Sequence, residues 1–171
     1  LQNDLFAQVK SGRVPMATLL DMAGHFSGEH FYLPLSSLDS HLFEAFLVLR
    51  GDIRTRTAQT AIALMDAALD TIGRLPSPDE SQTTAMLRDQ LFVHGALIGN
   101  PDILAFLADQ FEAFVTGSTI APDIFKGVMT AGAVSGGQPA LDAMVHRLEA
   151  SEVEHERMTL VGALGFFSRW P

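Results

Sequence analysis

The sequence has no cysteine among its 171 residues, which excludes a disulfide framework and cysteine-ligated zinc. A reducing compartment such as the cytoplasm fits this composition but is not required by it. Basic residues are also few, since 11 lysines and arginines accompany 20 aspartates and glutamates and the formal net charge is −9. An acidic surface repels phosphate backbones, and no run of basic residues offsets that repulsion. We therefore expect no nucleic-acid partner.

Long hydrophobic runs and strand patterns are missing as well. The longest apolar runs, 91–99 and 160–167, are far shorter than the roughly 20 residues that span a bilayer, so we expect no membrane partner. Strict alternation and Asn-Gly or Asp-Gly turns are absent, which argues against a sheet. The first residues lack the pattern of a signal peptide. Because Leu1 stands in the middle of a helical pattern, we expect a piece of a longer or processed polypeptide.

The chain is rich in apolar residues at helical spacing. Its composition, 47% hydrophobic and 18% charged, is typical of a globular protein. A chain of 171 residues can form one domain that buries roughly two thirds of the surface exposed by its unfolded form. We expect residues 1–171 to form a single helical-repeat domain.

The stretch 86–115 predicts two helices joined by a short turn. Apolar residues recur at three- and four-residue steps on both sides of the turn. Gly99 suits the left-handed conformation that ends a helix, and Asn100 suits the cap of the next one. Pro101 fits the first helical position, and Asp102 faces the positive end of the helix dipole. So short a connection predicts antiparallel helices whose apolar stripes need further helix pairs to cover them.

Similar breaks predict helices along the whole chain. Helices that open near Pro101, Pro122 and Pro139 recur at about 20 residues, so a pair occupies about 40, as in HEAT-type repeats. Two capping boxes, 77–80 and 151–154, are expected to start the helices that follow them. We predict an all-α fold, with nine or ten helices in a curved stack of antiparallel hairpins (HEAT/ARM-like) and no sheet. Core positions are expected to include Leu5, Val9, Leu19, Leu35, Leu38, Leu42, Leu64, Met65, Leu91, Ile103, Leu107, Val128, Met129, Met144 and Leu164.

The segment 152–157, Glu-Val-Glu-His-Glu-Arg, is the strongest candidate for a metal site. A zinc-peptidase helix needs His-Glu-x-x-His, because two histidines four residues apart share one face. His155 is followed four residues later by Thr159, so the second ligand is missing. An acidic first turn that complements a helix dipole is the better interpretation.

Other candidate residues have structural interpretations too. His41 with Glu44, and His146 with Glu149, fit surface pairs, and His94 fits a hydrogen-bonded core position. Residues 36–41 contain serine, aspartate and histidine but fall on different sides of a helix, and 132–137 lacks the Lys-Ser/Thr of a phosphate loop. Helix packing is expected to explain the glycines at 95, 99, 162 and 165. We therefore assign no catalytic, cofactor-binding or metal residue.

The order of short motifs resembles the C-terminal helical domain of the M1 zinc aminopeptidases, a group that includes the endoplasmic-reticulum, puromycin-sensitive and alanyl aminopeptidases. Leu35 stands where that family usually has tryptophan, and the family's domain continues with further helices beyond the position of Pro171. The motifs that carry the resemblance are Asn3–Val9 with Ser11–Val14, Leu19–Met22, Glu29-x-x-Tyr32-x-Pro34, Met86–Arg88, Asn100-Pro101, Phe111 with Phe114, Ile120–Pro122 and Leu160–Gly165.

The resemblance implies a right-handed α-α superhelix that forms the earlier part of the C-terminal domain of a longer metallopeptidase. The zinc-binding His-Glu-x-x-His would lie in a separate catalytic domain, which removes N-terminal amino acids from peptides. This chain would carry no cofactor and no catalysis of its own; it would cap the active-site chamber and limit access of peptides. Its expected partners are that catalytic domain, peptide substrates and, through exposed residues among Val161, Leu164, Phe166 and Phe167, a second copy of the chain.

Two alternatives stay open at this point. The first is an independent helical-repeat scaffold for protein–protein interaction. The second is a small metal-dependent hydrolase, which requires at least three ligands that converge in space.

Overall fold

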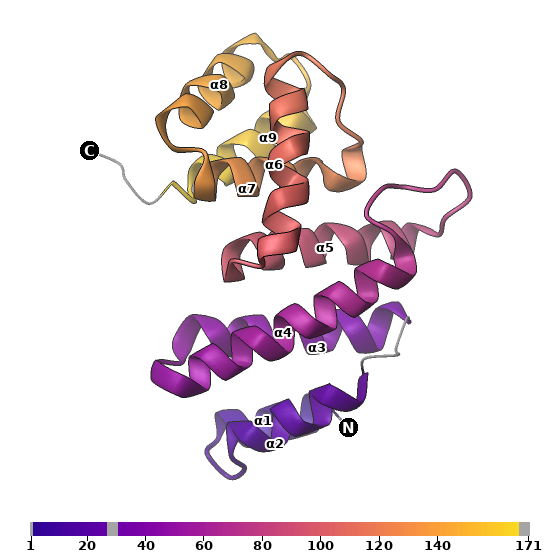
Figure 1. Cartoon of the computed structure of the whole chain (residues 1–171), viewed down its shortest axis with the longest axis vertical. Helices are drawn as coiled ribbons and strands as arrows, with labels where there is room; N and C mark the ends of the chain where they lie inside the picture. Colours follow the sequence, from indigo (N-terminus) through magenta and orange to yellow (C-terminus); the bar gives the residue numbers. More distant parts are fainter. Residues whose placement is uncertain (1, 27–30, 168–171) are drawn as a thin grey trace. The chain divides into compact units, whose positions relative to one another are not determined.

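The computed structural model describes residues 2–26 and 31–167, and every element within those ranges is helical (Figure 1). Leu1 and the motif residue Glu29 lie outside them. The predicted all-helical fold is confirmed for the described residues, which form nine α-helices and one short 3-10 turn. These are α1 (Gln2–Lys10), α2 (Met16–Ala23), η1 (Gly24–Phe26), α3 (Tyr32–Val48), α4 (Gly51–Ile72), α5 (Gln82–Ile98), α6 (Pro101–Val115), α7 (Pro122–Ser135), α8 (Gly137–Ala150) and α9 (Glu154–Leu164).

The helices divide into two compact units, with the boundary inside α5 between Leu87 and Arg88. The N-terminal unit contains α1 to α4 and the first turns of α5. The C-terminal unit contains the rest of α5 and α6 to α9. A single domain over residues 1–171 stays a prediction.

In the N-terminal unit, α3 and α4 pack together as a hairpin, and α2 contacts both α1 and α4. Gly51 begins α4 with a φ of 62°, a conformation that favours glycine, so this residue allows the chain to turn from α3 into α4. On α1 the core residue is Phe6, whereas Leu5 and Val9 are only half-buried. The core positions expected on α2, α3 and α4 are buried: Leu19, Leu35, Leu38, Leu42, Leu64 and Met65.

In the C-terminal unit, α7 contacts α6, α8 and α9. This central position explains why α7 is buried almost from end to end, including Val128 and Met129. A Cβ on Gly127 would lie 2.6 Å from the Cβ of Phe92, and one on Gly132 would meet the ring of Phe111. A larger residue at 127 would therefore force a shift at Phe92, and one at 132 would force the Phe111 ring to move.

The turn between α5 and α6 has the predicted conformation at each residue. Gly99 has a φ of 88°. The Asn100 side chain accepts hydrogen bonds from the backbone N–H groups of Asp102 (3.0 Å) and Ile103 (3.2 Å). The chain bends by 108° between α5 and α6, so this corner is more open than an antiparallel hairpin. Within the described ranges no single helix is long and apolar enough to cross a membrane; α5 and α6 pass the length and composition test only as a bent pair.

Both predicted capping boxes are wrong about which residue caps the helix. Helix α5 begins at Gln82, and its cap is Ser81, whose Oγ accepts from the Thr84 N–H at 3.2 Å. Helix α9 begins after Val153, which makes no side-chain cap, while Ser151 ends α8. At α5 a serine directly before the helix satisfies a first-turn donor, whereas at α9 no side chain caps the helix and the Ser151 hydroxyl donates to Glu156.

Two of the four expected glycine contacts differ from the prediction as well. Gly95 does pack closely, since an added Cβ would meet the Ile103 side chain. Gly99 serves the turn instead, and an added Cβ there would meet nothing within 4 Å. The same is true of Gly162, which lies exposed on α9. A Cβ added to Gly165 would lie 3.3 Å from the carbonyl oxygen of Gly162, which is a tight contact.

Candidate functional site

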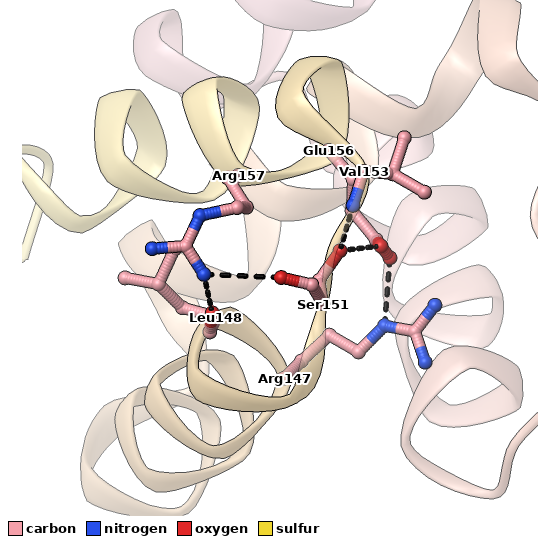
Figure 2. Close-up of polar contacts among 6 residues, drawn as sticks. All are labelled: Arg147, Leu148, Ser151, Val153, Glu156 and Arg157. Carbon is pink, nitrogen blue, oxygen red and sulfur yellow. Dashed lines mark hydrogen bonds and ion pairs between the residues drawn. The ribbon is translucent and has the colours of Figure 1, made fainter.

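The acidic segment 152–157 joins α8 to α9 through a compact polar network (Figure 2). Arg147 on α8 donates from Nε to Oε1 of Glu156 at 2.7 Å, and the Ser151 hydroxyl donates to Oε2 of the same carboxylate. Burial opposes ionisation of Glu156, but the hydrogen bonds from Arg147 and Ser151 outweigh it and hold the pKa of Glu156 below its ordinary value. The carboxylate is therefore charged and already occupied by protein donors.

The end of α8 is closed by a second arginine. Arg157 donates from Nη1 to the carbonyl oxygens of Leu148 (2.5 Å) and Ser151 (3.0 Å) (Figure 2). Carbonyl groups at the C-terminus of a helix have no partner within the helix, so the arginine satisfies them. The Ser151 Oγ also accepts from the Val153 N–H at 3.2 Å. We call this set of contacts the α8–α9 corner: Arg147, Leu148, Ser151, Val153, Glu156 and Arg157.

The predicted acidic first turn is confirmed, because Glu154 and Glu156 lie in the first turn of α9. In the part of the chain that the structure describes, no three side chains of histidine, aspartate or glutamate converge as a metal site does. The segment therefore connects two helices, and its charges serve that connection.

A cavity of about 370 Å³ lies beside the α8–α9 corner, under the loop between α6 and α7. Its apolar wall includes the rings of Phe114 and Phe125, which meet edge to face with centroids 5.9 Å apart. Its polar edge is formed by Arg147, His155 and Glu156. The cavity thus combines aromatic surface with charged and polar groups, as small-molecule sites do.

The polar edge of the cavity includes hydrogen-bond donors that the protein leaves unused. Each oxygen of Glu156 already accepts one bond. Nη1 and Nη2 of Arg147 have no protein partner within the described ranges, and half of that side chain is exposed. The hydroxyls of Ser118 and Thr119 also line the cavity and make no protein hydrogen bond among the described residues. The arrangement suits a ligand that carries acceptors.

His41 and Glu44, predicted as a pair, have other partners. The His41 ring stacks on Phe6 with centroids 4.2 Å apart, and its Nε2 lies 2.9 Å from Oδ1 of Asn3. Glu44 instead pairs with Lys10 at 3.2 Å. Burial lowers the pKa of His41, the nearby Glu44 raises it, Lys10 lowers it, and the net direction is downward. This group fastens α1 to α3.

The other candidates from the sequence are dispersed. Asp39 is fully buried and Ser40 is exposed, so the serine, aspartate and histidine of 36–41 form no triad. His146 and Glu149 are both exposed on α8, and His94 is half-buried on α5. Residues 132–135 form the end of α7, Gly136 is its C-cap, and Gly137 begins α8.

Asp89 is a titratable residue that sequence reasoning did not single out. It lies 4.0 Å from the Lys126 ammonium on α7, and burial raises its pKa while Lys126 lowers it. Asp89 and Lys126 are far apart in sequence on different helices, so no local pattern marks the pair. The cavity was missed for the same reason, because its lining comes from α6, α7, α8, α9 and the loops between them.

Comparison with known proteins identifies the family. The family model described as the ERAP1-like C-terminal domain matches residues 1–169. No individual curated protein matches the sequence. Because the family match spans nearly the whole sequence, the chain belongs to the family of ERAP1-like C-terminal domains.

Proposed function

We propose that this chain is a non-catalytic helical domain of a zinc metallo-aminopeptidase and that it caps the active-site chamber of a catalytic domain in the same polypeptide. The observation that carries the proposal is the family match over residues 1–169. In such an enzyme the catalytic domain holds the zinc ion, which activates a water molecule for attack on the first peptide bond. The helical domain contributes a wall that limits which peptides enter.

The α8–α9 corner supports a structural role for the acidic segment 152–157. Glu156 is held by Arg147 and Ser151, and Arg157 is held by backbone carbonyls. Side chains committed to such contacts keep a helix pair in a fixed geometry, which is what a wall requires. Residues 1–171 would form one helical-repeat domain, with its hairpins arranged as a right-handed superhelix.

We further propose that exposed apolar residues of α9 and of the segment that follows it allow a second copy of the chain to bind. Val161 is 54% exposed and Phe166 is 40% exposed, while Leu164 and Phe167 are half-buried. Met158 is 67% exposed on the same helix. Exposed apolar side chains of this kind favour association when they form a patch. Sedimentation over a range of concentrations tests this: a rising mean mass that Val161→Ser reduces is expected, and a strictly monomeric chain contradicts it.

The non-catalytic assignment is tested with amino-acyl fluorogenic substrates and added zinc. The isolated chain is expected to show no turnover above a heat-denatured sample. Robust turnover that a chelator abolishes would contradict the assignment and favour a metal-dependent hydrolase.

The capping assignment is tested by binding. The chain is titrated in trans into the catalytic portion of its parent polypeptide in a calorimeter. Saturable one-to-one binding is expected. Failure of the chain to bind the catalytic portion would contradict the capping role.

A further inference from the structure

The cavity beside the α8–α9 corner has a chemistry that the proposed capping role does not use. Its volume of about 370 Å³ is at the small end of ligand sites, which range from about 300 to 1,000 Å³. A space of this size suits one aromatic ring with a short chain attached. The polar residues that line the cavity determine which polar group such a ligand would carry.

The apolar wall selects for a flat, apolar ring. Phe114 and Phe125 already meet edge to face, with an angle of 66° between their planes. A third ring can join them in the same offset manner, which is worth about 0.5–1.5 kcal/mol beyond area burial in ordinary aromatic pairs. Ile120, Pro122 and Val153 complete the apolar part of the lining.

The polar edge selects for an anion. The guanidinium of Arg147 is fixed through Nε by Glu156 at 2.7 Å, which leaves the edge formed by Nη1 and Nη2 for a ligand (Figure 2). That edge has the spacing of a carboxylate and binds one bidentately. Glu156 also lines the cavity; its charge is balanced by that of Arg147, and the Ser151 hydroxyl is bonded to its second oxygen.

We propose that this cavity binds a small aromatic carboxylate, with the ring against Phe114 and Phe125 and the carboxylate on the Nη edge of Arg147. His155 and the hydroxyls of Ser118 and Thr119 supply further hydrogen-bonding groups at the rim. Binding there bridges α8 to the α6–α7 loop, since the ligand contacts both. The inference does not depend on the proposed capping function.

The test uses the whole 171-residue chain and two probes, 3-phenylpropionate and its neutral amide, titrated at pH 7 and followed by ¹H–¹⁵N NMR. The acid is expected to saturate with a Kd of about 0.1–1 mM, because a ligand with so few atoms cannot bind much more tightly. Its binding should shift the signals of residues around Phe114, Phe125 and Arg147. The amide is expected to bind about tenfold more weakly. Equal binding of acid and amide, or no saturation, would overturn the proposal.

Three variants distinguish the loss of the binding site from a loss of stability at the α8–α9 corner. Arg147→Gln is expected to weaken acid binding about tenfold and to leave amide binding within about twofold. Arg56→Gln, an exposed arginine on α4, is the matched control and should change neither. Glu156→Gln keeps the guanidinium and an amide oxygen that can accept from its Nε, so it should bind the acid as tightly as the parent or more tightly. If Glu156→Gln stays folded and still loses binding as Arg147→Gln does, the loss reflects the corner and the site is wrong.

A third comparison concerns the source of the carboxylate. A short peptide with a C-terminal phenylalanine carries the same ring and carboxylate as the free acid. The free acid is expected to bind at least as tightly, because the cavity has room for little more. Binding of the peptide tenfold tighter than the acid would overturn the assignment to a small molecule.

Discussion

Nε of Arg147 on α8 lies 2.7 Å from Oε1 of Glu156 on α9, and this charge pair spans the turn between two consecutive helices. The carboxylate is only 15% exposed, whereas the arginine side chain is 52% exposed. The Glu156 side chain is thus largely shielded from water, whereas the Arg147 side chain is half exposed to solvent. The pair holds the corner and at the same time presents the free edge of the guanidinium to the neighbouring cavity.

Glu156→Gln should destabilise the chain by about 1 kcal/mol, because the amide replaces charge-assisted bonds from Arg147 and Ser151 with weaker ones. The folded-state pKa of Glu156 is lowered, so its stabilising contribution is present above the ordinary value of 4.5 and is lost as the pH falls through the folded-state value. Urea unfolding at pH 7 measures the change. Glu149→Gln, exposed on α8, is the control and should stay within about 0.5 kcal/mol.

Gly127→Ala should cost about 1–3 kcal/mol, because the new methyl group would lie 2.6 Å from the Cβ of Phe92, an atom that cannot move without the backbone. Gly162→Ala makes the same chemical change on α9, where nothing lies within 4 Å. It should be neutral or stabilise the chain by up to about 1 kcal/mol, since alanine favours helix more than glycine. Thermal unfolding of both variants gives the comparison. Similar effects at the two positions would show that close packing does not govern Gly127.

Asn100→Ala should destabilise the chain by about 1–2 kcal/mol, because it removes the acceptor for two N–H groups at the start of α6 in a fully buried position. Asn100→Ser keeps a capping oxygen and should recover part of that loss. The free energy of unfolding is measured in urea for all three proteins. An alanine variant as stable as the serine variant would contradict the capping role.

The stability of the chain should decrease as the pH falls below about 7, because His41 is more easily protonated in the unfolded state. Its folded-state pKa is lowered from the ordinary 6.5, chiefly by burial. The unfolded chain therefore binds more protons as the pH falls from 6.5 to the folded-state value. His41→Gln should reduce the slope of stability against pH in this window, and His146→Gln, on an exposed part of α8, should leave it unchanged. Hydrogen exchange of α1 amides at pH 7.5 and 5.5 locates the effect.

The features that were predicted correctly from the sequence depend on residues that are close together along the chain. Gly99, Asn100 and Pro101 each act within one helical turn, so their roles follow from local conformation alone. The angle of 108° at that same turn does not, because it is set by what α5 and α6 pack against. Phe6 was overlooked in favour of Leu5 and Val9 for a similar reason.

Contacts between distant residues account for the other differences. Phe6 is buried because it stacks on His41, a residue 35 positions away that no periodicity relates to it. The segment 152–157 was recognised as an acidic first turn, but its partner Arg147 and the adjacent cavity were not. Serines at 77 and 151 fit the capping pattern as well as Ser81 does, and only the observed helix starts distinguish them.

The most direct test of the account compares the full-length parent enzyme with a form from which residues 1–171 have been deleted. For each form, kcat/KM is measured on an amino-acyl dipeptide and on a folded protein with an accessible N-terminus. If the chain caps the chamber, its deletion should raise the rate on the protein relative to the dipeptide by at least about tenfold, because access rather than chemistry limits the larger substrate. An unchanged ratio, with both enzymes active, would contradict the capping role.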